Sequence, residues 1–417
     1  MKPDIEGFMY PYFDKSTCID CGLCEKSCPV INQNEPQKPI SVYAAINPDE
    51  DIREKSSSGG VFTVLAEKVI EEGGVVFGAK FNNCWEVVHG YVEVIEELEK
   101  LRGSKYVQSR IGSTYREVES FLKTGKKVLF SGTPCQVAGL YRYLHKYYDN
   151  LITVDFICHG VPSPGVWSKY LNEVVIAGKQ AILDVGFRNK SKGWKRFSFA
   201  LDMKKNSDTV SMLSPVNKNP YMSAFLHDLI LRPSCYQCPV KGGKSCSDIT
   251  IADFWGVQNV NPNIDDDKGT SLVLVNTEKG KSAIPFDNLH YEVSTGDALK
   301  YNSAYYKAAN MNPRRFAFFT SLEKGENLHQ IIEETLRPSA KQRIKQLLNP
   351  PIQFAKKSIM MMFGRRSKPR IEMGNYDEFH IQKQELILIP ASIDFRDKRN
   401  GWKHYMLRID MTIIDGE

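Results

Sequence analysis

The sequence contains no long apolar run of the kind that crosses a membrane. No stretch approaches the ~18 consecutive apolar residues of a membrane-spanning helix, and the opening residues MKPDIEGFMYPYFDK include no apolar signal-peptide core. Concentrated charge is missing too, because the net charge is only +6 over 417 residues and no long basic block precedes residue 350. We therefore expect a cytoplasmic protein that has no transmembrane segment and binds no nucleic acid.

The sequence is rich in apolar residues and in cysteines. Hydrophobic residues make up 42% of the chain, which suffices for two or three packed units. The ten cysteines need a reason, since disulfides are rare in the reducing compartment that we expect. Metal binding or catalysis therefore outranks a disulfide framework. One group of cysteines lies near the N-terminus, a second lies around residue 240, and the others stand alone: Cys18, Cys21, Cys24 and Cys28, then Cys235, Cys238 and Cys246, and lastly Cys84, Cys135 and Cys158.

The N-terminal cysteines have the spacing C-x2-C-x2-C-x3-C-P. A tight loop with cysteine at every third position aims the thiolates of Cys18, Cys21 and Cys24 at three irons of one cubane. In ferredoxin folds the fourth cysteine of such a run, here Cys28, ligates the other cluster. A zinc knuckle can share one C-x2-C pair, but four thiolates at this spacing with a trailing proline favour iron and sulfur. We predict a ferredoxin-like 4Fe-4S module over residues 1–40.

This module contains only half of the two-cluster ferredoxin pattern. The preceding segment EGFMYP-x-F-D resembles the short hairpin that links the two halves of a bacterial-type dicluster ferredoxin, and it begins almost at Met1. Either the chain as given starts late, or the remaining cysteines are recruited differently. From the ligand count we expect the 417-residue chain to bind the N-terminal cluster poorly or not at all, with Cys28 well away from the other three thiols.

Beyond residue 40 the hydrophobic pattern alternates between strands and helices. The periodicity predicts strands at 42–46, 75–80, 127–130 and 152–157, and helices at 58–72, 115–124 and 136–147. Such alternation indicates an α/β core domain with a mixed (α+β) or largely parallel sheet. Ligands sit in the loops at the carboxyl ends of strands in such sheets. Cys135 and Cys158 both fall in loops of this kind, which makes them candidate ligands.

Six motifs follow one another in an order that is similar to a known family. They are SSSGGVFTVLAEKVIEEGGVVFGA, RGSKYVQS, FSGTPCQVAGL, ICHGVPSP, RPSCYQCP and SDITIADFWG. Together they resemble the beta subunits of coenzyme F420 hydrogenases and dehydrogenases, and the resemblance spans residues 10–325 of the sequence. It implies an N-terminal family domain at 41–125, a C-terminal family domain at 126–325 and a tail at 326–417.

The resemblance also implies FAD and a 4Fe-4S cluster in the core domain. Carried over residue by residue, the expected core ligands are Cys135, Cys158, Cys235 and Cys238. Two strand-end thiolates and one C-x2-C pair can converge on a cubane, although burial as small apolar residues is the alternative for the first two. Cys246 stands where similar sequences usually lack a cysteine, and its ligation stays open. Cys84 has no metal spacing, and we expect it to be structural.

Two of the family motifs are candidates for holding the flavin. Ser58-Gly59-Gly60 opens a helix, so its amide groups can hold a phosphate or an isoalloxazine carbonyl. The stretch Arg102-Gly103-Ser104-Lys105-Tyr106 offers two cations and an aromatic face beside small residues. No G-x-G-x-x-G fingerprint follows a strand, which favours FAD over a nicotinamide cofactor. The segment Asp253-Phe254-Trp255-Gly256 follows an apolar strand, and the sequence leaves open whether it touches the cofactor.

Two segments of the chain repeat each other. Residues 187–203 and 395–411 share the pattern F-R-x-K-x-x-G-W-K, an aromatic residue at the same place and a final D-M. The first copy is expected to be a solvent-edged hairpin with a basic, aromatic turn. Two copies are too few for a solenoid, so the pattern indicates a partial duplication or a joined gene fragment. The basic stretch 356–370 suits either contact with a membrane surface or partner, or a poorly ordered linker.

These features favour an iron–sulfur flavoprotein oxidoreductase that passes electrons between 4Fe-4S clusters, FAD and a small organic hydride donor or acceptor similar to coenzyme F420. A flavin accepts a hydride and can release single electrons to a cluster. The expected partners are a protein such as ferredoxin or a hydrogenase or dehydrogenase subunit, and a small-molecule redox substrate. Two alternatives stay open: a ferredoxin-fed reductase of a specific organic substrate, and a subunit that only relays electrons. The sequence identifies no catalytic acid or base.

Overall fold

The computed structural model describes residues 1–12, 14–176, 181–285, 290–338, 391–397 and 401–407. The chain divides into two compact units, Met1–Pro338 and Ser339–Glu417. In the second unit, β14 (Ala391–Asp397) pairs with β15 (Gly401–Leu407) in an antiparallel hairpin. This hairpin covers part of the second copy of the repeat, and the basic stretch 356–370 lies outside the described residues.

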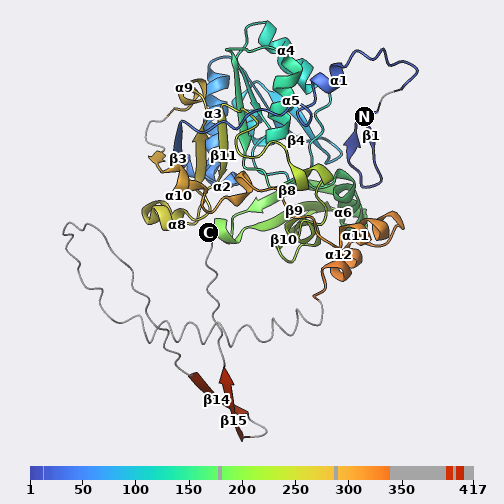
Figure 1. Ribbon diagram of the computed structural model, residues 1–417, viewed down its shortest axis with the longest axis vertical. Helices are drawn as coiled ribbons and strands as arrows, with labels where there is room; N and C mark the ends of the chain where they lie inside the picture. Colours follow the sequence, from blue (N-terminus) through green and yellow to red (C-terminus); the bar gives the residue numbers. More distant parts are fainter. Residues whose placement is uncertain (13, 177–180, 286–289, 339–390, 398–400, 408–417) are drawn as a thin grey trace, which may run out of the picture. The chain divides into compact units, whose positions relative to one another are not determined.

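An eight-stranded mixed sheet forms the centre of the first unit (Figure 1). Its pairs β4–β6, β6–β7 and β7–β11 are parallel, and the other neighbours are antiparallel. The large mixed sheet confirms the α/β fold that the strand and helix pattern predicts. In spatial order the strands are β13 (His290–Glu292), β3 (Ser41–Ala45), β12 (Ser271–Val275), β11 (Ile249–Asp253), β7 (Leu151–Phe156), β6 (Val128–Ser131), β4 (Val75–Phe81) and β5 (Val87–Val92).

Helices cover both faces of this sheet because successive strand residues point to opposite sides. Val76 of β4 belongs to the apolar cluster that includes Leu65 of α3 (Val61–Glu71). Its neighbours Val75 and Phe77 instead belong to the cluster formed with α4 (Thr114–Lys123) and α5 (Pro134–Leu144). The strands β7 and β12 are buried almost throughout, and the loops that follow the parallel strands β6 and β7 leave the sheet at the same edge.

A second, three-stranded antiparallel sheet packs with four helices around its own apolar cluster. The first copy of the repeat lies in this sheet, and its turn is exposed to solvent, as predicted, at Ser191, Lys192, Lys195 and Arg196. Two other residues of the turn, Lys190 and Trp194, are buried instead. Trp194 is 1% exposed and Lys190 is 5% exposed, because each finds polar partners inside the protein. The elements are β8 (Ala181–Asn189), β9 (Ser198–Lys205), β10 (Asp208–Pro215), α6 (Pro164–Ile176), α7 (Pro220–Leu226), α11 (Arg315–Glu323) and α12 (Leu328–Leu336).

The N-terminal segment begins with a small hairpin of β1 (Lys2–Pro3) and β2 (Met9–Tyr10), followed by the short helix α1 (Leu23–Lys26) within the cysteine run. No helix in the described ranges is long and apolar enough to cross a membrane. The remaining short elements are α2 (Glu50–Lys55), η1 (Ile95–Lys100), η2 (Trp194–Arg196), η3 (Pro233–Gln237), α8 (Val257–Val260), η4 (Pro262–Ile264), α9 (Glu278–Ala283), α10 (Thr295–Leu299) and η5 (Ser303–Tyr305).

Candidate functional site

Two of the predicted core cysteines lie where adjacent parallel strands end. Cys135 is in the first turn of α5, four residues beyond β6, and Cys158 follows β7 by two residues. Because β6 and β7 are parallel neighbours, both loops emerge at the same edge of the sheet. The local sequence explains the sharp strand-to-helix turn: Thr133 and Gln136 form a capping box, and Pro134 occupies the first helical position.

The C-x2-C segment lies directly beside the Cys158 loop. Cys235 belongs to η3, and Cys238 follows its last residue. The backbone N–H of Val161 points at the Cys235 sulfur over 3.5 Å. A Cβ added to Gly160 would lie 3.3 Å from the Cys235 Cβ, so glycine permits this close approach. The two cysteine-bearing segments are therefore held against each other by short backbone contacts.

The four predicted core thiols lie within electrostatic reach of one another. Burial raises the pKa of Cys158 well above its usual value, and the thiols of Cys135, Cys235 and Cys238 raise it further. Burial likewise raises the pKa of Cys235 to about 11. Desolvation also raises the pKa of Cys135, although the residue as a whole is exposed. Their raised pKa values keep Cys135, Cys158 and Cys235 as thiols in the absence of a bound cation.

Among the described residues, no three His, Cys, Asp or Glu side chains are close enough to hold one metal ion. A cubane spreads its four thiolate ligands over four irons, which requires a wider arrangement than a mononuclear site. Ligation of a cluster by Cys135, Cys158, Cys235 and Cys238, which the family resemblance implies, stays a prediction.

A small cavity of about 20 Å³ lies beside Cys158 and has room for about one water molecule. Asp155 lines it and is 2% exposed, and its Oδ1 has no hydrogen-bond partner among the described residues. Burial raises the pKa of Asp155 to about 6. Lys241 also lines the cavity and donates to the carbonyl of Cys158 and, over 2.8 Å, to that of Ala304. This cavity is too small for an organic cofactor or substrate.

The other cysteines have different surroundings. Cys246 is half-buried near Arg142 and Asp155, and burial raises its pKa. Cys84 is exposed between β4 and β5, where its N–H donates to the side chain of Asn82 over 2.9 Å. The N-terminal thiols are exposed or half-exposed around α1: Cys18, Cys21, Cys24 and Cys28.

The two predicted flavin-binding segments meet each other. Ser57, which precedes the Ser58-Gly59-Gly60 stretch, accepts hydrogen bonds from the N–H and hydroxyl of Ser104 over 2.6 and 2.8 Å. The Arg102 guanidinium donates to the Thr63 hydroxyl in the first turn of α3 over 3.1 Å. Segments that are more than forty residues apart in the sequence are thus joined near the start of one helix.

Several groups of these segments already have partners within the protein. The N–H of Gly59 donates to the Ser271 hydroxyl over 3.0 Å, and the ammonium of Lys105 donates to the Arg102 carbonyl over 2.9 Å. Burial lowers the pKa of Lys105 to about 7. The Tyr106 ring stacks on Phe225 with centroids 4.7 Å apart. The Ser58 hydroxyl is engaged as well, since it donates to the Thr270 carbonyl over 2.9 Å.

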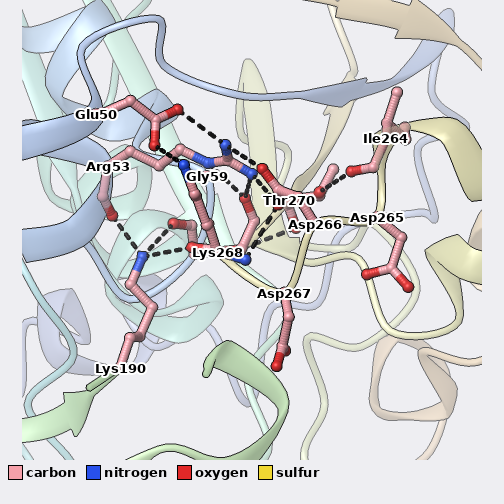
Figure 2. A network of polar contacts seen from close by, with 12 residues as sticks. Glu50, Arg53, Gly59, Lys190, Ile264, Asp265, Asp266, Asp267, Lys268 and Thr270 are labelled. Carbon is pink, nitrogen blue, oxygen red and sulfur yellow. Dashed lines mark hydrogen bonds and ion pairs between the residues drawn. The ribbon is translucent and has the colours of Figure 1, made fainter. Parts of the chain in front are cut away.

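A polar network around the buried cations Arg53 and Lys190 holds the Ser58-Gly59-Gly60 segment in place (Figure 2). The Arg53 side chain, 1% exposed, donates to the Asp266 carboxylate over 2.7 and 2.8 Å and to the Gly269 carbonyl over 2.8 Å. The Lys190 ammonium donates to three carbonyls, at 2.5 Å to Arg53, 2.7 Å to Lys268 and 3.3 Å to Ser58. Burial lowers the pKa of Lys190 to about 8. The sequence pattern missed both cations, although Lys190 belongs to the repeated F-R-x-K motif.

The D-F-W-G segment and the repeat motif contact each other at the same sheet edge. The Arg188 guanidinium pairs with the Asp253 carboxylate over 2.8 and 3.1 Å and lies 3.3 Å from the Tyr106 hydroxyl. Trp194 donates its indole N–H to Asp253 over 3.0 Å and stacks on Trp255 with centroids 4.8 Å apart. Arg188 therefore links the second candidate flavin segment to the end of β11.

Fold and cysteine pattern together define an iron–sulfur electron-transfer protein. A 4Fe-4S binding domain matches residues 9–30. The N-terminal model of the beta subunit of coenzyme F420 hydrogenase/dehydrogenase matches residues 42–114, and the C-terminal model of that subunit matches residues 125–292. The chain belongs to the coenzyme F420 hydrogenase/dehydrogenase beta subunit family, a family of oxidoreductase subunits.

Two further comparisons add little to this assignment. No curated protein matches the chain. Among solved structures, the chain is similar to a chain of the xenon-derivatised F420-reducing [NiFe] hydrogenase complex from Methanosarcina barkeri. The two are 15% identical, the match covers 72% of this chain and 92% of the other, and the TM-score is 0.42. A TM-score this low supports no inference about the site.

Proposed function

We propose that this protein is an FAD- and 4Fe-4S-dependent oxidoreductase that exchanges electrons between its core cluster and a small organic hydride donor or acceptor similar to coenzyme F420. The observation that supports this most directly is the convergence of four thiols, from three loops, at the sheet edge that also carries the two joined flavin-candidate segments. Family membership sets the class of reaction, and the site residues supply the chemistry within it.

In this proposal Cys135, Cys158, Cys235 and Cys238 hold the core cluster. The Thr133 hydroxyl lies 3.1 Å from the Cys135 sulfur and lowers its pKa, which partly opposes the desolvation of that thiol. Cluster binding replaces the protons of the four thiols and thereby couples cluster insertion to the stability of their loops.

The joined segments around Gly60 and Gly103 hold the flavin in this proposal. Both glycines have positive φ, at 83° and 82°, and a Cβ at Gly103 would meet no atom within 4 Å. A backbone turn with open space around it allows a ligand to approach closely. Gly60 caps α3, whose first turn is a favourable place for a phosphate, and Arg102 supplies a cation beside it. When bound, FAD accepts or donates a hydride and exchanges single electrons with a cluster.

The proposed partners follow from the family. A beta subunit works beside other subunits, so we propose a hydrogenase or dehydrogenase subunit or a ferredoxin-type protein as the electron partner, and a small-molecule redox substrate at the flavin.

Anaerobic purification with joint quantification of iron, sulfide and flavin tests the proposal. We expect FAD, released by denaturation and identified by chromatography, and about four irons per chain for the core cluster. Reduced deazaflavin and reduced ferredoxin, offered separately, then identify the electron donor by bleaching of the flavin absorbance. Finding FMN, or no flavin after reconstitution with FAD, would contradict the proposal.

A further inference from the structure

Arg232 joins the N-terminal hairpin to the core cysteine loops. Its backbone N–H donates to the Val161 carbonyl over 2.9 Å, and its carbonyl accepts from the Cys235 N–H over 2.8 Å. Val161 follows Cys158 by three residues, so the Arg232 backbone lies between two of the cysteine-bearing segments. Its position is therefore fixed by the same loops that present the thiols.

The Arg232 side chain extends to the N-terminal hairpin. Two of its nitrogens donate to the Met9 carbonyl, each over 3.2 Å, and one also donates to the Gln108 side chain over 3.0 Å. The guanidinium carbon lies 4.1 Å from the centre of the Tyr10 ring, in a cation–π contact. The hairpin thus supplies both a hydrogen-bond acceptor and an aromatic face to this cation.

The hairpin itself is firmly seated on the family domain. Phe8 is 0% exposed, and Glu6 pairs with Arg315, one of whose bonds is 2.6 Å long. Gly7 has φ 84°, and a Cβ there would lie 2.5 Å from the Cα of Gly165. Only glycine allows the two backbones to approach this closely, so the seating depends on residue 7.

The Arg232 guanidinium forms no ion pair with a carboxylate of the described residues. In the described part of the chain the arginines with ion pairs are Arg53, Arg110, Arg188 and Arg315, and Arg232 is not among them. Its positive charge lowers the pKa of Cys135 and of Cys235, against the larger effect of burial. The same charge acts on any negative charge that these sulfurs hold.

We infer that Arg232 is a positioning and tuning residue, which raises the reduction potential of the core cluster and makes that potential depend on the seating of the N-terminal hairpin. This inference rests on the proposed function, because it assumes a cluster on the four core cysteines. One-electron reduction adds one negative charge, with the electron supplied by dithionite in the assay or by a ferredoxin-type protein. A nearby uncompensated cation stabilises the added charge, and net charge and solvent exposure are among the factors that set cluster potentials.

The hairpin enters this relationship because it covers Arg232. With the hairpin seated, the guanidinium is held half-buried among Met9, Tyr10 and Gln108; with the hairpin displaced, solvent screens its charge. Coupling of this kind is reciprocal, so reduction of the core cluster should also tighten the seating of the hairpin. Electron acceptance by the core is thereby linked to the segment that leads into the N-terminal cysteine run.

The test is a redox titration of the core cluster followed by electron paramagnetic resonance. A Cys21→Ala background removes one thiolate of the N-terminal run, so the remaining signal comes from the core. Arg232→Gln should lower the core potential, and Arg232→Lys should lower it less. The matched control is Arg142→Gln, because Arg142 also contacts the N-terminal segment, at Asn34, but acts on Cys246. This control should leave the core potential unchanged.

Unseating the hairpin provides the second arm of the test. Gly7→Val should lower the core potential, and adding it to Arg232→Gln should give no further decrease. Hydrogen exchange at residues 4–9 should speed up in both single variants, in the apo chain as well as in the loaded protein. An unchanged core potential in Arg232→Gln would overturn the inference. So would a full further decrease of the potential when Gly7→Val is added to Arg232→Gln. A wild-type core without a cluster would instead overturn the proposed function.

Discussion

The hydroxyl of Ser57 accepts two hydrogen bonds from Ser104, one from its N–H over 2.6 Å and one from its hydroxyl over 2.8 Å. This contact connects the turn before α3 to the turn after η1. Both turns carry a glycine with positive φ next to candidate flavin ligands, at Gly60 and Gly103. Because the two turns are hydrogen-bonded to each other, a change in one turn should also alter how the other contacts a ligand.

Ser57→Ala removes the shared acceptor and should loosen both turns. The N–H of Ser104 would lose its partner in a half-buried place, which costs about 1–2 kcal/mol of folding free energy. If the joined turns hold FAD, the variant should also bind it roughly tenfold more weakly, a loss of about 1.4 kcal/mol. Fluorescence titration of the apo chain with FAD measures this. Ser113→Ala is the control, since Ser113 is exposed and its hydroxyl donates to the Glu117 side chain in α4.

Cys158→Ala and Cys235→Ala should each abolish the core cluster signal. A cubane needs four protein ligands, and each of these thiols is one of the four that influence one another. Electron paramagnetic resonance of the reduced protein, with iron analysis, is the measurement. Cys84→Ala, at an exposed turn, should keep the full signal. A spectrum that survives both core substitutions would remove these cysteines from the site.

The sequence pattern predicted the sheet well because buried strands leave a strong signal. The apolar run at 75–80 became β4 (Val75–Phe81) and the run at 152–157 became β7 (Leu151–Phe156). Helix ends were less predictable, since they depend on single backbone angles. The helix expected from residue 58 starts at Val61 because Gly60 has φ 83°, and the helix expected to reach 147 stops at Leu144 because His145 has φ 54°.

In the candidate site, too, residues in local sequence motifs could be predicted, whereas residues whose environment depends on tertiary contacts could not. The four cysteines expected to bind the core cluster come from motifs that occur in a known order, and their loops meet at the expected edge, whereas their role as ligands stays a prediction. Arg188 and Lys190 were expected in a solvent-edged turn, because an isolated basic segment indicates a surface. Both are buried because they find partners inside the protein: Asp253 pairs with Arg188, and three backbone carbonyls accept from Lys190. All of these partners lie more than sixty residues away in the sequence, so a local pattern does not reveal them.

Breaking the Arg188–Asp253 pair should be far more costly than breaking an exposed pair. Arg188→Gln would leave the Asp253 carboxylate, whose side chain is 18% exposed, without its cation, and removing one partner of a buried pair costs about 3–5 kcal/mol. Arg110→Gln is the matched control, because Arg110 and Glu86 are 55% and 56% exposed and such pairs contribute about 0–1 kcal/mol. Urea unfolding of the apo chain compares the two. Equal losses would show that the Asp253 pair is effectively solvent-exposed.

His89 should make the fold sensitive to acid. Its Nε2 lies 3.0 Å from the Ser131 carbonyl, which requires a proton on that nitrogen, and its Nδ1 then accepts from the Ser109 hydroxyl over 2.9 Å. Burial lowers the pKa of His89 from 6.5 to about 4. Between these two pH values the unfolded chain binds the proton and the folded chain does not. Stability therefore falls as the pH drops from 6.5 to 4, by up to about 3 kcal/mol from this one residue.

His89→Gln removes the titrating group while keeping a side chain that can donate to the Ser131 carbonyl. We expect the variant to be less stable than wild type near neutral pH, because the ring packing on Phe130 is lost. Its free energy of unfolding should nevertheless decline less steeply between pH 6.5 and 4. Urea unfolding of the apo chain at several pH values within this window measures the slope. His145→Gln, at an exposed position, should retain the wild-type slope. An unchanged slope in His89→Gln would mean that His89 takes up its proton in the folded chain as readily as in the unfolded one, and that its burial in the fold does not govern its charge.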